Sequence, residues 1–112
     1  MIKRAYDFLK NEDLAAAQES LDSALRMDFD NQEVIFAQKC AGFWLDRVLR
    51  AQSMQNQFER GEYLLSQWKS FAGYLKRLDE DYADAVYAFR QYIFSFALRS
   101  FQSAIPLSPC GS

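Results

Sequence analysis

The stretch from residue 12 to residue 31, EDLAAAQESLDSALRMDFDN, contains one complete helix pattern with the signals that start and stop it. Asp13 stands where an N-cap is expected, and strong helix formers follow it. The polar turn DFDN at 28–31 ends the pattern. The apolar residues between these signals recur at helical spacing on one side, namely Leu14, Ala17, Leu21, Ala24 and Leu25. The stretch predicts an amphipathic helix over 14–27.

The rest of the chain continues this alternation of helix pattern and polar turn. It contains 4 glycines and 2 prolines, and both prolines, Pro106 and Pro109, lie close to the last residue, so the body carries few helix breakers. We expect Asn31 to cap the next helix. The sequence predicts an all-α fold with further helices at 2–10, 32 to about 52, about 58–78, and 82–105, the last being one long helix or two packed ones.

The segment 82–105 carries two apolar stripes. One consists of Tyr82, Val86, Phe89, Ile93 and Phe96, and the other of Tyr87, Phe94 and Phe101 at steps of seven. A helix that is apolar on two faces is expected to be buried on two sides. The sequence therefore predicts neighbours on both sides of this helix.

Composition narrows the function classes. The 112 residues include 13 Lys+Arg and 15 Asp+Glu, which gives a net charge of −2 and fits one compact soluble domain. The basic residues form no stripe, so we expect no nucleic-acid partner. No stretch is long and apolar enough to cross a membrane, and Lys3 and Arg4 stand where a secretion signal would be apolar, so we expect a cytoplasmic protein without membrane contact.

The chain contains no histidine. This removes Ser–His and Cys–His nucleophile pairs and histidine-containing zinc sites. Cys40 and Cys110 form no CxxC motif, and Cys40 is expected to be a small buried hydrophobe. The acidic run 79–81 fits a helix start better than a metal site. We expect no enzyme activity, no catalytic residue, no cofactor and no metal.

A small–large–small pattern recurs near the two ends of the chain. Small residues let two helices approach, and the larger residue fills the space between them. The first copy consists of Ala17, Leu21 and Ala24, and the second of Ala97, Phe101 and Ala104. With Pro109 after the second copy, and Phe29 replacing that proline after the first, the pattern resembles the second helix of a tetratricopeptide repeat.

The resemblance implies a short right-handed solenoid of about three irregular repeats, each an antiparallel helix pair. The repeats would span 1–31, 32–78 and 79–109 within one domain at 1–105, followed by a flexible tail at 106–112. Ala17 and Ala97 are 80 residues apart, about two periods of about 34 plus about 12 residues, which predicts an insertion near 50–57. In the middle repeat, Gly61–Tyr63 resembles the family's turn between paired helices. A helical bundle without repeats is the alternative.

Tetratricopeptide domains are scaffolds that hold a peptide or helix of a partner protein in a concave groove, and the resemblance implies the same function here. Projecting the groove positions by phase selects Tyr6, Phe36, Phe43, Tyr82, Val86, Phe89 and Arg90. Each of the aromatic residues could also belong to the core. The alternative function is structural, with the aromatics of 58–78 and 82–105 forming a homodimer or the flank of a longer repeat array.

Overall fold

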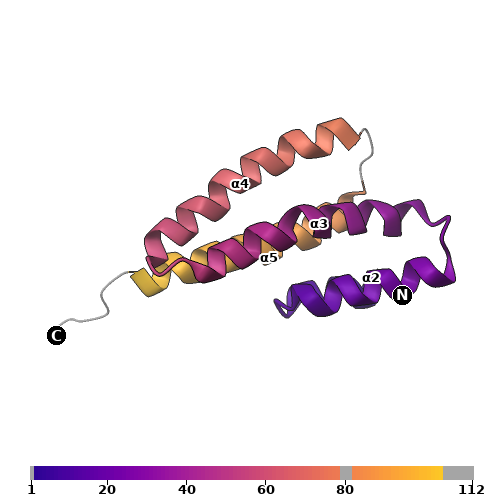
Figure 1. Ribbon diagram of the computed structural model, residues 1–112, viewed down its shortest axis with the longest axis horizontal. Coiled ribbons are helices and arrows are strands. Elements are labelled where there is room, and N and C mark those ends of the chain that lie inside the picture. Colours follow the sequence, from indigo (N-terminus) through magenta and orange to yellow (C-terminus); the bar gives the residue numbers. More distant parts are fainter. Residues whose placement is uncertain (1, 79–81, 105–112) are drawn as a thin grey trace.

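The computed structural model describes residues 2–78 and 82–104 and shows only α-helices in that part of the chain (Figure 1). The prediction of an all-α fold is confirmed. The expected tail at 106–112 and the acidic run 79–81 lie outside the described residues. The helices are α1 (Ile2–Lys10), α2 (Leu14–Met27), α3 (Gln32–Ser53), α4 (Gln57–Leu78) and α5 (Ala83–Ala104).

Three helix starts are capped by an Asp or Asn side chain, which accepts a hydrogen bond from a backbone N–H of the first turn. Asp13 Oδ1 accepts from the N–H of Ala16 at 3.0 Å, and Asn31 Oδ1 accepts from Val34 at 3.1 Å. Both predicted caps are confirmed. Asn56 caps α4 in the same way, accepting from Glu59 at 3.0 Å.

The turn between α1 and α2 is a Schellman motif, in which two backbone hydrogen bonds close the end of a helix. The N–H of Asp13 donates to the carbonyl of Phe8 at 2.8 Å, and the N–H of Glu12 donates to Leu9 at 2.9 Å. Glu12 has φ 63°, in the left-handed region that usually holds glycine. Because Asp13 also caps α2, only three residues separate the two helices.

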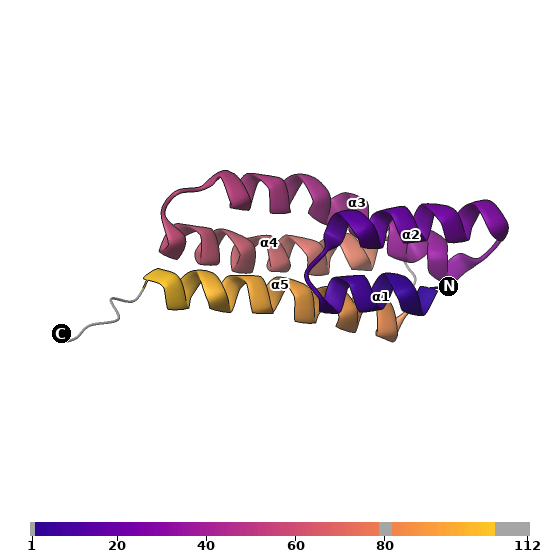
Figure 2. The ribbon, with the colours of Figure 1, turned by 90° about the horizontal axis from the view of Figure 1, so that it is seen from below.

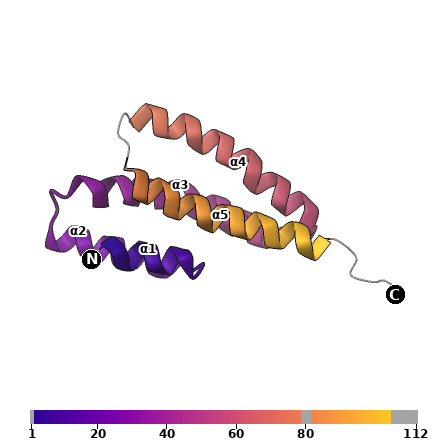
Figure 3. The same ribbon diagram turned by 180° about the vertical axis from the view of Figure 1, so that it is seen from behind.

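The three long helices form the body of the molecule. The helices α4 and α5 pack side by side in antiparallel directions, and α3 packs against both (Figures 1 and 2). The α1–α2 hairpin lies on the side of α3 and α5 that is opposite to α4, which is also visible from behind (Figure 3). This hairpin covers one end of the α3–α5 pair.

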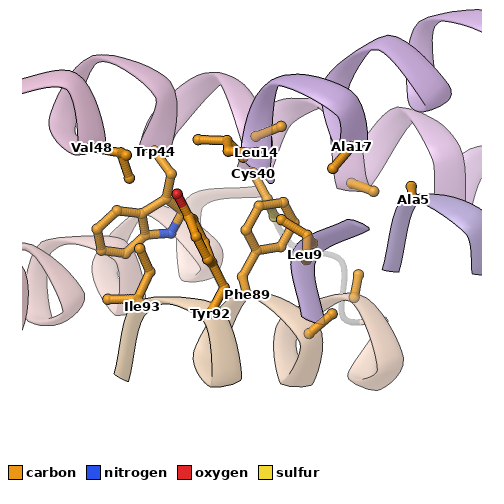
Figure 4. Close-up of a cluster of buried hydrophobic side chains, with 14 of the residues drawn as sticks. Ala5, Leu9, Leu14, Ala17, Cys40, Trp44, Val48, Phe89, Tyr92 and Ile93 are labelled. Atoms are coloured by element: carbon orange, nitrogen blue, oxygen red, sulfur yellow. The ribbon is translucent and has the colours of Figure 1, made fainter. Parts of the chain in front are cut away.

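Side chains from all five helices form the core. Figure 4 shows the part in which residues of α1, α2, α3 and α5 meet. Leu9 of α1, Leu14 of α2, Trp44 of α3 and Phe89 of α5 are all buried. Burying each large apolar side chain stabilises the fold by about 1.5–3 kcal/mol. The core therefore fixes the α1–α2 hairpin onto the long helices.

The packing does not confirm a solenoid. In a solenoid each repeat contacts only its neighbours, whereas α1 packs directly against α5. The helix α5 is continuous from Ala83 to Ala104, which answers the question of one helix or two for the described residues. The long helices of the body therefore enclose a shared core instead of stacking as separate pairs.

Gly61–Tyr63 is not a turn, which corrects the expectation from the sequence. These residues lie inside α4. A Cβ atom at Gly61 would be 2.7 Å from the ring of Phe101 on α5. The glycine allows a close approach of α4 and α5 where the sequence pattern indicated a break.

Candidate partner-binding surface

The residues projected as a groove do not line one surface. Phe36 and Phe89 are fully buried, so neither can contact a partner in this structure, which corrects their assignment to the groove. The ring of Phe36 lies 5.2 Å from that of Tyr82, and the ring of Phe89 lies 6.5 Å from that of Phe71. Both rings are used to pack helices together.

Four other projected residues are half-buried, and three of these lie in different contacts between helices. The Tyr6 hydroxyl of α1 donates to Glu33 Oε2 of α3 at 2.8 Å, and burial together with this hydrogen bond raises the pKa of Tyr6. The ring of Phe43 packs at a tilt against that of Tyr74 of α4, with 5.0 Å between centroids, and Tyr82 packs on Phe36 as described above. Val86 packs against the buried core.

Arg90 is the one exposed member of the projected set, and it borders a shallow hollow on α5. The hollow has a volume of about 270 Å³. The Arg90 guanidinium carbon lies 5.4 Å from the centroid of the Phe94 ring, which is within reach of a cation–π interaction. The hollow is lined by Tyr87, Arg90, Gln91, Phe94, Ser95 and Leu98.

Apolar side chains on the outer side of α5 are open to solvent beside this hollow. Tyr87 is 60% exposed and Leu98 is 57% exposed. The antiparallel neighbour α4 adds two exposed apolar side chains, Phe58 at 52% and Leu65 at 39%. We call this surface the α4–α5 face, and define it by Phe58 and Leu65 of α4 together with Tyr87, Phe94, Leu98 and Phe101 of α5.

Aromatic contacts hold the α4–α5 face together across the two helices. The rings of Phe58 and Phe101 meet edge to face with 5.4 Å between centroids. The rings of Trp68 and Phe94 do the same at 5.2 Å. Such pairs contribute about 0.5–1.5 kcal/mol beyond the area they bury. The face is therefore an ordered surface and not a set of independent side chains.

The sequence contained the signal for this face, and the expected neighbour covers two of the three residues of the second stripe. The steps of seven at Tyr87, Phe94 and Phe101 predicted a side of the helix that a neighbour covers. In the structure, α1, α3 and α4 all pack against α5. Phe94 and Phe101 of the second stripe pack against Trp68 and Phe58 of α4, whereas Tyr87 is exposed. The sequence pattern marks an apolar stripe, and it does not tell whether the neighbour belongs to the same chain.

Catalytic chemistry has little support among the side chains of the described residues. In residues 2–78 and 82–104 there is no group of three or more Cys, Asp or Glu that could hold a metal ion. Burial raises the pKa of the Cys40 thiol to about 12, so the thiol is protonated at neutral pH and is a poor nucleophile. The buried Tyr92 hydroxyl has its pKa raised to about 12, again mainly by burial.

Comparisons with known proteins assign no family. No protein-family model, curated protein or solved structure matches the chain. No helix within the described ranges combines the length and the apolar character needed to cross a membrane. The function must therefore be argued from the surface itself.

Proposed function

We propose that this chain is a protein-interaction domain that binds a helix of a partner protein through the α4–α5 face. The observation that carries the proposal is the pair of apolar side chains on the outer side of α5, Tyr87 and Leu98, which are more than half exposed. Contiguous exposed apolar surface of this kind marks interaction sites in monomeric proteins. The chain thus acts as a scaffold or adaptor and not as an enzyme.

The shape of the face suits a helical ligand. Two antiparallel helices form the face, and an amphipathic helix packs on such an apolar surface with side chains at steps of three, four and seven. Tyr87, Phe94 and Leu98 follow these steps on α5. The hollow of about 270 Å³ between them has room for one apolar anchor of the ligand.

The proposal uses the resemblance to tetratricopeptide repeats only for the α1–α2 pair. The α1–α2 pair has an antiparallel arrangement and a short turn that fit one helix pair of that family, and this supports a repeat-like origin of the hairpin. The proposed binding face lies elsewhere, on α4 and α5. The proposal therefore does not depend on a solenoid or on a concave groove.

A homodimer through the same face is the second candidate function. It is favoured by the place of the exposed aromatics, which lie on the two helices where the sequence predicted an oligomer contact. A concentration series in analytical ultracentrifugation separates the two functions. A monomer at all concentrations leaves a heterologous partner as the occupant.

Two leucines of equal exposure provide the test. Leu98 on the α4–α5 face is 57% exposed, and Leu49 on α3 is 56% exposed but belongs to no such face. In a pull-down, we expect the Leu98→Glu variant to lose partner proteins that the wild-type chain captures, and the Leu49→Glu variant to capture them still. Circular dichroism checks that both variants stay folded. Identical retention by all three chains would contradict the proposal.

A further inference from the structure

The charged side chains beside the α4–α5 face are predominantly basic on the α4 side. Residues four apart on a helix are neighbours on its surface. Glu62, Lys69 and Lys76 follow Phe58, Leu65 and Ala72 by four residues each, and all three charged residues are exposed. The rim of α4 is thus acidic at one end and basic along the rest of its length.

The α5 side adds a further positive charge. Arg90 lies over Phe94 at the border of the hollow, and the neighbouring rim residues Gln91 and Ser95 are neutral. Asp84 lies seven residues before Gln91 and therefore on the same side of α5. Its charge also contributes to the raised pKa of the Tyr6 hydroxyl of α1. Among the described residues the rim contains three basic groups, Lys69, Lys76 and Arg90, and two acidic groups, Glu62 and Asp84.

This charge distribution stands out against the rest of the molecule, because the whole chain has a net charge of −2. A second copy of the chain would bring one basic rim against another, and like charges across an interface are unfavourable. A ligand with acidic flanks would pair with Lys69, Lys76 and Arg90 while its apolar side fills the face. Complementary rim charges of this kind raise the association rate and select the partner.

We propose that the occupant of the α4–α5 face is an amphipathic helix of another protein whose apolar stripe is flanked by Asp and Glu side chains. The proposal rests on the proposed function and adds the chemistry of the partner. The length of the face sets the length of the ligand, since Tyr87 and Phe101 are 14 residues apart, or about 21 Å along α5. A partner helix of about four turns spans this distance.

The test uses a display library of designed helices of about 16 residues, with leucine fixed at the apolar positions and Glu or Lys allowed at each flanking position. The full wild-type chain and Leu98→Glu are the two targets of selection. We expect wild type to enrich helices with Glu at the flanks and Leu98→Glu to enrich none. Affinity for a selected acidic helix should fall by about tenfold or more between about 0.05 M and 0.5 M salt.

Reversing the charges of the rim tests the acidic partner separately from the proposed helix-binding function. The triple variant Lys69→Glu/Lys76→Glu/Arg90→Glu should lower the affinity for the acidic helix by about tenfold or more and should prefer helices with Lys at the flanks. All three positions are exposed, so circular dichroism is expected to show an unchanged fold. If the library selection depends on Leu98 but shows no preference for Glu at the flanking positions, the partner is not acidic. The proposal that the face binds a helix would then still hold.

Three other results would also overturn the proposal of an acidic helix. If no helix is enriched by wild type, both this proposal and the helix-binding function fail. If the chain instead binds vesicles of phosphatidylcholine and phosphatidylserine, and Leu98→Glu removes that binding, the basic rim serves a lipid surface. Dimerisation that Leu98→Glu abolishes would assign the face to a second copy.

Discussion

A single methyl group at Gly61 should test the contact on which the α4–α5 face is built. A Cβ atom there would lie 2.7 Å from Cε1 and Cζ of Phe101 and 2.8 Å from its Cε2. These distances are far shorter than an ordinary carbon contact of about 3.5–4.0 Å. The substitution Gly61→Ala therefore forces the Phe101 ring to move.

The magnitude follows from what the ring loses. Moving it off its rotamer costs about 0.5–1.5 kcal/mol, and losing its edge-to-face contact with Phe58 costs about as much again. Alanine in place of glycine inside a helix returns about 1 kcal/mol. We expect Gly61→Ala to leave the free energy of unfolding unchanged or to lower it by up to about 2 kcal/mol.

Gly73 provides a matched control in the same helix. It lies inside α4, and a Cβ atom there would have no heavy atom within 4 Å, so Gly73→Ala should gain the full helix propensity of about 1 kcal/mol. Urea denaturation followed by circular dichroism measures both variants. In thermal melts, 1 kcal/mol corresponds to a shift in Tm of about 4 °C for a domain of this size.

A double variant ties the difference to the ring. Gly61→Ala/Phe101→Leu replaces the ring by a smaller side chain, so its free energy of unfolding should exceed the value expected from the two single variants by about 1 kcal/mol. If Gly61→Ala stabilises the chain as much as Gly73→Ala does, the ring does not sit over Gly61, and the described packing of α4 on α5 is wrong.

Two further predictions concern the hairpin turn and the buried thiol. Glu12→Gly should raise the free energy of unfolding by about 0.5–1 kcal/mol in urea denaturation, because glycine adopts φ near 63° without the cost that a side chain imposes; a loss of stability would show that the pairing of Glu12 with Arg99 outweighs the backbone strain. Alkaline pH should destabilise the chain, because the Cys40 thiol ionises at its ordinary pKa of 9.0 when unfolded but only at about 12 when folded, so the unfolded state loses its proton first. Between about pH 7 and pH 10.5 the Cys40 thiol alone should lower the free energy of unfolding by on the order of 2 kcal/mol. The free energy of unfolding of Cys40→Ala, measured at both pH values, should therefore fall by less than that of wild type. Equal falls would contradict the burial of the thiol.

The sequence predicted the helices well because each signal that starts or ends a helix lies within a few residues of the chain. Asp13 and Asn31 mark the starts of α2 and α3 through their own hydrogen bonds to the backbone. The expected range for the first helix, 2–10, agrees with α1, and the polar stretch after Ser53 separates α3 from α4. These features depend on capping and periodicity, which act along the chain and need no knowledge of the fold.

The arrangement of the helices could not be predicted in the same way. Gly61–Tyr63 resembles the turn between paired helices of tetratricopeptide repeats, but glycine also allows two helices to pack closely. Only the position of Phe101 distinguishes the two roles. The phase of the repeat pattern placed Phe36 and Phe89 in a groove. It identifies the side of the helix on which a residue lies, but not the element that packs against that side. The contact of α1 with α5 joins the two ends of the described chain, and no repeat spacing encodes it.

The stability of the fold and the function of the α4–α5 face should respond to different substitutions on the same helices. Phe58 and Phe101 pack against each other across α4 and α5, so the face is ordered before any partner arrives, and binding need not restrain these side chains anew. Leu98, being largely exposed, contributes little to the packing of α5. A change at Gly61 should therefore alter both stability and binding, whereas Leu98→Glu should alter binding alone. If the two effects cannot be separated in this way, the exposed stripe is part of the fold, and the surface has no independent role in recognition.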